Sequence, residues 1–105
     1  MSVLDQNIEK LNGYLRRFKE TGIQNRIAGV DCTGAGGVFQ TSSPVDKSII
    51  CDVARGDASD IDVAAKAAAD AFPIWRDMPA LERRKILLRV ADGIEARAEE
   101  IALCE

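Results

Sequence analysis

Apolar residues recur at intervals of three and four near the start of the chain, and this helical spacing constrains the fold more than any other feature. Between residues 2 and 21 they form one stripe of an α-helix: Leu4, Ile8, Leu11, Leu15 and Phe18. Ser2 and Asp5 match a capping box, and Gly22 provides a C-terminal stop. The pattern predicts an N-terminal amphipathic helix within residues 1–22.

Short β-branched runs replace this spacing over residues 23–56. They predict three short strands, at residues 26–30, 38–41 and 49–54. The glycine-rich stretch 33–37 predicts a hairpin loop between the first two strands, because glycine adopts the positive φ that such turns need. Pro44 and Asp46 predict the turn into the third strand.

Residues 57–105 return to helical spacing. Ser59, with Asp62 at the third helical position, predicts a helix start, and the stripe that follows is Ile61, Ala65, Ala68 and Phe72. Pro73 predicts the end of this helix. Pro79 opens a further helical segment with the stripe Leu87, Ala91, Ile94, Ala98 and Ile101. Gly93 costs about 1 kcal/mol relative to alanine, which predicts a kink or a break into two helices there.

Acidic residues stand near the end of the chain, where a helix C-terminus favours cations. Glu99, Glu100 and Glu105 would lie in the last turns of the final helix, and no glycine or asparagine closes it. The pattern predicts a helix that is cut, with a frayed natural terminus as the alternative.

Length and charge exclude several classes of function. The 105 residues, 47% of them hydrophobic, suffice for one core. A net charge of -3, from 17 acids and 14 bases, disfavours nucleic-acid binding. No run of about 18 apolar residues predicts a membrane span, and residues 1–12 lack the apolar region of a secretory signal.

Residue counts restrict the chemistry further. Cys32, Cys51 and Cys104 lack close spacing, which fits a reducing cytoplasm better than a disulfide framework. Three scattered thiols cannot close a four-coordinate zinc site, and the chain has no histidine to act as ligand or general base. None of the thiols has a sequence neighbour that would activate it, so each is interpreted as a buried or incidental thiol.

Four other patterns have both a functional and a structural interpretation, and the structural one is favoured each time. Residues 34–37 are interpreted as a turn, because a phosphate-binding loop would open a helix and here a strand follows. Residues 83–85 with Arg89 are interpreted as a solvated helix face rather than an anion patch. The acid pairs Asp60 with Asp62 and Glu99 with Glu100 are interpreted as helix caps or solvated charges rather than proton-transfer groups. Phe72 with Trp75 is interpreted as a core anchor rather than a stacking platform.

An ordered run of short segments adds a resemblance: residues 38–44, 49–56, 60–62, 64–68, 71–72, 75–76, 82–83, 86–87, 90–92, 94–95 and 100–105. This run resembles the N-terminal part of the aldehyde dehydrogenase superfamily. Residues 7–11, 26–29 and 43–46 look most like the branch that oxidises 5-carboxymethyl-2-hydroxymuconate semialdehyde. The resemblance implies an α+β fragment of the α/β aldehyde dehydrogenase fold, with an N-terminal helix, short antiparallel strands and two or three further helices.

The resemblance also implies an activity and its cofactor. The parent enzyme would use NAD or NADP to oxidise an aldehyde or semialdehyde to a carboxylate, in the cytoplasm and as a homo-oligomer. Residues 57–105 would be the truncated helical part of its cofactor-binding domain. In that family the nucleophilic cysteine, the base and the cofactor contacts lie downstream of the matched region. No catalytic or cofactor-binding residue is therefore assigned, and this chain alone is expected to be inactive and to bind no cofactor.

One site is implied within the matched region. In some members of the superfamily, backbone oxygens at positions matching Thr41 and Ser42 help to hold a structural monovalent cation. Many members have asparagine at the position of Ser43, so this sequence departs from the family pattern beside that site.

Two hypotheses follow for the role of the chain. The first is an N-terminal scaffold piece of an NAD(P)-dependent aldehyde dehydrogenase, whose partner is the remainder of the parent chain. The competing hypothesis is an independent α+β module that uses its exposed stripes to bind a partner helix or to dimerise.

Overall fold

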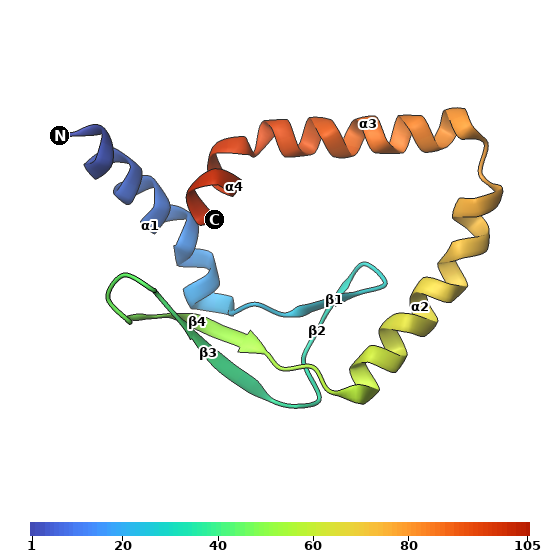
Figure 1. Ribbon diagram of the computed structural model, residues 1–105, viewed down its shortest axis with the longest axis horizontal. Helices are drawn as coiled ribbons and strands as arrows, with labels where there is room; N and C mark the ends of the chain where they lie inside the picture. Colours follow the sequence, from blue (N-terminus) through green and yellow to red (C-terminus); the bar gives the residue numbers. More distant parts are fainter. The chain divides into compact units, whose positions relative to one another are not determined.

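A computed structural model describes all 105 residues. The elements follow in the order α1 (Val3–Thr21), β1 (Asn25–Ile27), β2 (Val30–Cys32), β3 (Val38–Ser42), β4 (Ile49–Ala54), α2 (Ala58–Asp77), α3 (Ala80–Ala96) and α4 (Ala98–Cys104) (Figure 1). The strands form two separate two-stranded sheets, so the predicted α+β class is confirmed. None of the helices has the length and apolar character needed to cross a membrane.

The chain divides into two compact units. One unit is the continuous segment Leu15–Ala71, and the other combines Met1–Tyr14 with Phe72–Glu105. The first contains both sheets, and the second contains the end of α2, the helices α3 and α4, and the first turns of α1.

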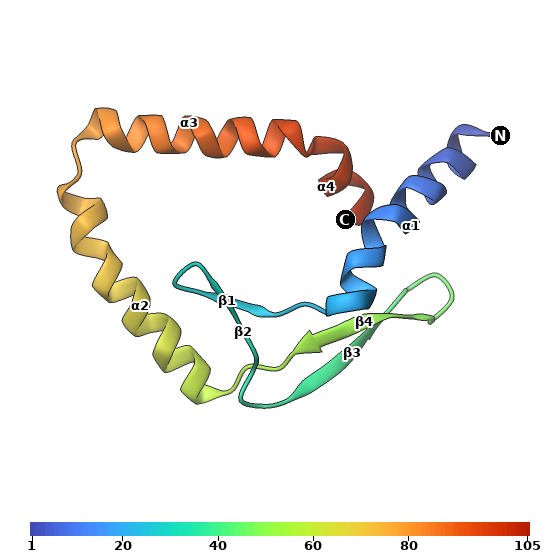
Figure 2. The ribbon, with the colours of Figure 1, turned by 180° about the vertical axis from the view of Figure 1, so that it is seen from behind.

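The predicted strand 26–30 is wrong, because a tight turn reverses the chain inside it. Ala28 and Gly29 both have positive φ, 53° and 77°, and β1 pairs antiparallel with β2 through Ile27 and Val30 on either side of them (Figure 2). Two consecutive residues with positive φ are the geometry of the common two-residue hairpin turn. Glycine supplies this conformation without strain, which allows a hairpin where the sequence suggested one strand.

The second hairpin joins β3 to β4 and holds the buried residues of the chain. Val38 pairs with Ala54 and Thr41 with Cys51, and both partners on β4 are buried. Residues 43–48 make the predicted turn, and the predicted strands at 38–41 and 49–54 are confirmed. Ile23 adds a parallel bridge to Val53, with its N–H donating to the Asp52 carbonyl at 2.8 Å.

Residues 33–37 do not close a hairpin between paired strands, so that prediction is also wrong. They connect β2 to β3, which lie in different sheets. The loop is held against the connection that follows β4, since the Gly36 N–H donates to the Arg55 carbonyl at 3.0 Å and the Arg55 N–H donates to the Gly37 carbonyl at 2.8 Å. A Cβ on Gly34 would overlap the Arg55 carbonyl, so only glycine fits there.

Three further predictions, about where helices begin and end, are wrong. The cap of α2 is Asp57 rather than Ser59, because the Asp57 carboxylate accepts hydrogen bonds from the Ser59 N–H at 2.8 Å and the Ser59 hydroxyl at 2.6 Å. Pro73 does not end α2, which continues to Asp77. Proline inside a helix removes one hydrogen bond and weakens the helix, but here it does not stop it.

The final break lies at Arg97 rather than at Gly93. Arg97 has φ -115° and ψ 19°, and α4 begins at the next residue. Glu99 and Glu100 therefore stand in the first turn of a new helix, where the macrodipole favours acids, and not in the last turn of the preceding one. The predicted capping box of α1 is confirmed, since the Ser2 N–H donates to Asp5 at 3.0 Å and the Asp5 N–H donates back at 3.1 Å.

Candidate functional site

Thr41 and Ser42, the implied cation ligands, lie at an irregular point of the β3–β4 pair. Thr41 is opposite Cys51 while Ser42 is opposite Ile49, so Ile50 is left as an extra residue on β4. Thr41 is half-buried and Ser42 is exposed. A bulge of this kind interrupts the ladder of hydrogen bonds and redirects the backbone groups beside it.

The turn that follows Ser42 is fixed by short polar side chains. The Ser43 N–H donates to the Ser48 carbonyl at 2.8 Å, and the Asp46 carboxylate accepts the Ser48 hydroxyl at 2.7 Å. This hydroxyl is the main reason why the pKa of Asp46 lies below its ordinary value. The Ser43 hydroxyl accepts the Val45 N–H at 3.2 Å, so serine provides a side-chain link within this turn.

The donor set of this segment fits a hard cation only in part. Main-chain oxygens are ligands that hard cations accept, but such ions in proteins take about six or more oxygens. Two carbonyl groups fall short of that number, and the chain has no cluster of three His, Cys, Asp or Glu side chains that could hold a metal. Any cation at Thr41 and Ser42 would need further oxygen ligands beyond these two carbonyl groups.

The glycine-rich loop and the N-terminus of α2 are bound to each other. The Asp60 carboxylate accepts the Ala35 N–H at 2.9 Å and the Asp57 N–H at 2.9 Å. The same carboxylate therefore completes the cap of the helix and ties down the loop. Its position explains the favoured interpretation of Asp60 as a capping residue.

The three cysteines are separated in the fold. Cys51 is buried in β4, Cys32 is half-buried at the end of β2, and Cys104 is exposed at the end of α4. All three are free thiols. The structure brings none of them together with another group that could ligate a metal.

Glu99 joins the C-terminal helix α4 to α1, a contact that sequence spacing could not reveal. Its carboxylate accepts the Lys10 ammonium at 2.7 Å and the Tyr14 hydroxyl at 3.1 Å. The Lys10 hydrogen bond is the main reason why the pKa of Glu99 lies below its ordinary value, with Tyr14 second. A general acid at neutral pH needs a raised pKa, so Glu99 has the electrostatics of an ion-pair residue instead.

The predicted core anchor is exposed in this chain. Phe72 is 57% exposed and Trp75 is 38% exposed, and the Arg76 guanidinium stacks over the Phe72 ring at 5.7 Å. The predicted stripes of the later helices are equally open to solvent: Ile61, Ala65, Ala68, Leu87, Ala91, Ile94, Ala98 and Ile101. This chain alone therefore leaves these stripes without cover.

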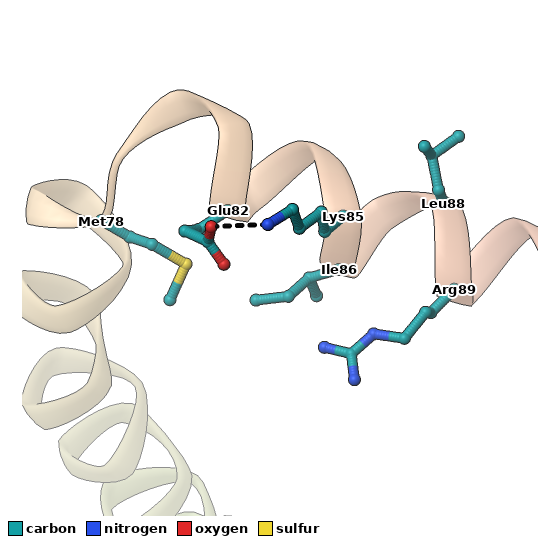
Figure 3. Close-up of a pocket in the computed structure, with 6 residues that line it drawn as sticks. All are labelled: Met78, Glu82, Lys85, Ile86, Leu88 and Arg89. Atoms are coloured by element: carbon teal, nitrogen blue, oxygen red, sulfur yellow. Dashed lines mark hydrogen bonds and ion pairs between the residues drawn. The ribbon is translucent and has the colours of Figure 1, made fainter.

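An open hollow of about 660 Å³ lies at the start of α3. Met78, Glu82, Ile86 and Arg89 project toward it, and Lys85 forms an ion pair with Glu82 at 2.9 Å (Figure 3). Leu88 points away from Ile86 and Arg89. Lys85 and Arg89 thus border apolar surface, while both remain exposed to solvent, as the sequence predicted for this face.

Comparisons with known proteins agree with this architecture. The aldehyde dehydrogenase family model matches residues 31–105. An aldehyde dehydrogenase of Vibrio cholerae is 41% identical over 71 residues, which cover 68% of this chain and 14% of the relative. The mitochondrial benzaldehyde dehydrogenase of Antirrhinum majus is 45% identical over 73 residues, with the same shares covered.

A solved structure gives the same result. The crystal structure of HpcC from Thermus thermophilus matches with a TM-score of 0.84 and 36% identity over 90% of this chain and 19% of that chain. The chain spans about 14% of the length of the curated relatives. Because the family match covers well over half of its residues, the chain belongs to the aldehyde dehydrogenase family.

Proposed function

We propose that this chain serves as the N-terminal scaffold of an NAD(P)-dependent aldehyde dehydrogenase, and that the chemistry resides in polypeptide that the chain does not contain. The observation that carries this proposal is the exposure of its predicted apolar stripes. Leu87, Ile94 and Ile101 are 57%, 56% and 49% exposed, although residues at such spacing normally pack on a neighbour. Only Cys51 and Ala54 are buried apolar residues.

The reaction would oxidise an aldehyde or semialdehyde to a carboxylate. A nicotinamide supplies the hydride acceptor in that chemistry, and a thiolate nucleophile attacks the aldehyde carbon. This chain would contribute neither group. Its residues would act by position: α2, α3 and α4 would support the cofactor-binding domain, and the Thr41 and Ser42 carbonyls would supply part of the shell of a structural monovalent cation.

Finer assignments extend this proposal. The substrate branch would be 5-carboxymethyl-2-hydroxymuconate semialdehyde, which rests on residues 7–11, 26–29 and 43–46. The structural match covers 90% of the chain and so includes residues before position 31, where the family match begins. We place the assembled homo-oligomer in the cytoplasm, on the basis of the free thiols Cys32, Cys51 and Cys104.

The test is to restore the missing polypeptide in one chain. Fusing this sequence to the part of Thermus HpcC that follows the matched region should give an enzyme that reduces NAD or NADP in the presence of a semialdehyde. The isolated chain should show neither this activity nor cofactor binding by calorimetry. An unfolded or inactive fusion, beside an active native HpcC control, would contradict the proposal.

A further inference from the structure

Helix α1 contains a pair of neighbouring residues that can react with each other. The chain has asparagine at positions 7, 12 and 25, and only Asn12 is followed by glycine. Asn12 and Gly13 are both exposed, and nothing lies within 4 Å of the place where a Cβ on Gly13 would stand. No side chain therefore shields the main-chain nitrogen of Gly13 from the carboxamide of Asn12.

The helical backbone keeps this pair from reacting. Inside an α-helix each N–H donates to the carbonyl four residues earlier, and ψ is held near about −42°, so the Gly13 nitrogen is neither free nor directed at the Asn12 side chain. Reaction therefore requires local opening of this turn of α1. Glycine is the poorest helix former after proline, and asparagine also ranks low, so the reactive pair occupies a weak turn.

The contact with Glu99 lies across the same turn. The Glu99 carboxylate accepts the Lys10 ammonium at 2.7 Å and the Tyr14 hydroxyl at 3.1 Å. Lys10 and Tyr14 are four positions apart, which places them on one face of α1, and Asn12 and Gly13 lie between them in the sequence. One carboxylate thus holds both ends of the turn that contains the reactive pair.

We propose that Asn12 is a site of spontaneous deamidation, and that Glu99 sets its rate by holding this turn of α1 closed. The Gly13 nitrogen attacks Cγ of Asn12, a C–N bond forms, and ammonia leaves with the proton of the Gly13 nitrogen, which gives a cyclic imide. Water then adds to one of the two imide carbonyls and breaks its bond to that nitrogen. The product is aspartate or isoaspartate, and the net reaction consumes one water and releases one ammonia.

Both products alter α1. Each places a new negative charge at residue 12, and isoaspartate also inserts a methylene into the main chain, which interrupts the regular ladder of helical hydrogen bonds. Lys10 and Tyr14 are then no longer separated by one regular turn, so their shared contact with Glu99 is lost. Deamidation therefore releases the contact between α1 and α4.

The experiment incubates the full chain in neutral buffer and follows it by tryptic digestion and mass spectrometry. Trypsin separates the three asparagines into the peptides 1–10, 11–16 and 20–26. Peptide 11–16 should gain the mass difference between NH₂ and OH and split into two isomers, about tenfold or more faster than the other two peptides react. Gly13→Ala should slow this reaction about tenfold, because the added methyl hinders the attacking nitrogen and alanine favours the helix.

Glu99→Gln tests the control of the rate. Lys10 and Glu99 are 49% and 54% exposed, and exposed ion pairs are weak, so the variant should deamidate at Asn12 about twofold to fivefold faster than the parent chain. Glu95→Gln is the matched control and should leave the rate unchanged, because Glu95 is an exposed acid of the neighbouring helix α3 without an ion pair.

The same measurement in concentrated urea gives the rate without the helix. There the parent chain, Glu99→Gln and Glu95→Gln should all react at one rate, several-fold above that of the folded parent chain. Three results would each overturn the inference: a peptide 11–16 that reacts no faster than the other two, a parent chain that reacts equally fast with and without urea, or a rate that Glu99→Gln leaves unchanged.

Discussion

Gly34 lies closer to a neighbouring backbone than any side chain would allow, and single residues of this kind decide the local geometry. A Cβ there would overlap the carbonyl oxygen and carbon of Arg55 and would lie 2.8 Å from its nitrogen. All three atoms are backbone, so a rotamer change cannot relieve the clash. The missing side chain of Gly34 is therefore a requirement of the contact between the loop and the segment that precedes α2.

Gly34→Ala should open this contact. Overpacking of a close site costs about 1–3 kcal/mol, so the amide exchange of Gly36 and Arg55 should accelerate by about fivefold or more. Gly13→Ala is the matched control, because nothing lies within 4 Å of its added methyl group and alanine favours the interior of α1. Unchanged exchange at both amides, measured by NMR, would show that the loop is held in another way.

Glu99→Gln should loosen the contact between α1 and α4, and the effect should depend on pH. The pKa of Glu99 is depressed from 4.5, so its contribution to stability is complete above that value and is lost as pH falls through the depressed pKa. The pKa of Lys10 is raised from 10.5, mainly by the hydrogen bond to Glu99, so its contribution is complete below that value and is lost as pH rises through the raised pKa.

The contact should therefore be strongest between about pH 4.5 and 10.5. In the Glu99→Gln variant the pKa of Lys10 should fall toward its ordinary value, which an NMR titration of the lysine side chain measures. Glu95→Gln removes an exposed acid that makes no ion pair and is the control. A Lys10 pKa that is identical in the parent and in Glu99→Gln would refute the link.

At the scale of elements, the sequence predicted what depends on local spacing. The stripe of α1, its capping box and the β3–β4 hairpin are confirmed, because each is specified by residues within a few positions of one another. The predicted boundaries failed where one backbone conformation decided the outcome. The turn at Ala28 and Gly29 divided a predicted strand, and the break at Arg97 reassigned Glu99 and Glu100 to a new helix.

The sequence predicted less of the candidate site than of the helices and strands. Asp57 and Asp60 stand at the spacing of a capping box, so the cap of α2 had a local signal that Ser59 obscured. The contact of Lys10 with Glu99 spans 89 positions and has no local signal. The bulge beside Thr41 and Ser42 is likewise a property of pairing with β4 and not of either strand alone.

Asp57→Ala tests which residue caps α2. Loss of its carboxylate removes the acceptor for the Ser59 N–H and hydroxyl, so the first turn should fray and its amides should exchange several-fold faster. Ser59→Ala should have a smaller effect, because the Ser59 hydroxyl donates to Asp57 and caps no backbone N–H of the helix. Equal effects of the two substitutions would restore Ser59 as the cap.

Pro73→Ala tests the continuity of α2. Proline in a helix interior costs about 3 kcal/mol relative to alanine, since it removes one hydrogen bond and its ring presses on the preceding turn. The substitution should increase helical content and slow amide exchange in residues 69–77. Pro79→Ala should change little, because Pro79 is the residue that precedes α3 and has no helical N–H to restore. If Pro73→Ala lowered the helical content, Pro73 would be a helix end after all.

At the scale of the whole molecule, the stability of this chain should depend on the polypeptide that completes the fold. Apolar side chains are largely exposed in both units. The two hairpins both lie in the unit Leu15–Ala71, and a lone two-stranded hairpin is marginal in water. Folding enthalpy comes from burial and packing, which this chain obtains at few positions. The chain should therefore melt without a cooperative transition when it is alone.

Calorimetry gives a quantitative form of this expectation. Compact proteins unfold with about 0.7 kcal/mol of enthalpy per residue near 60 °C, or roughly 70 kcal/mol for a chain of this length. The isolated chain should show a broad transition with a small fraction of that enthalpy, and fusion to the remainder of HpcC should restore the ordinary value per residue. A sharp transition with the full enthalpy of a compact protein, and a single species in sedimentation, would instead establish an independent interaction module, because it would mean that the stripes of α2 and α3 find their cover within the chain or its own oligomer.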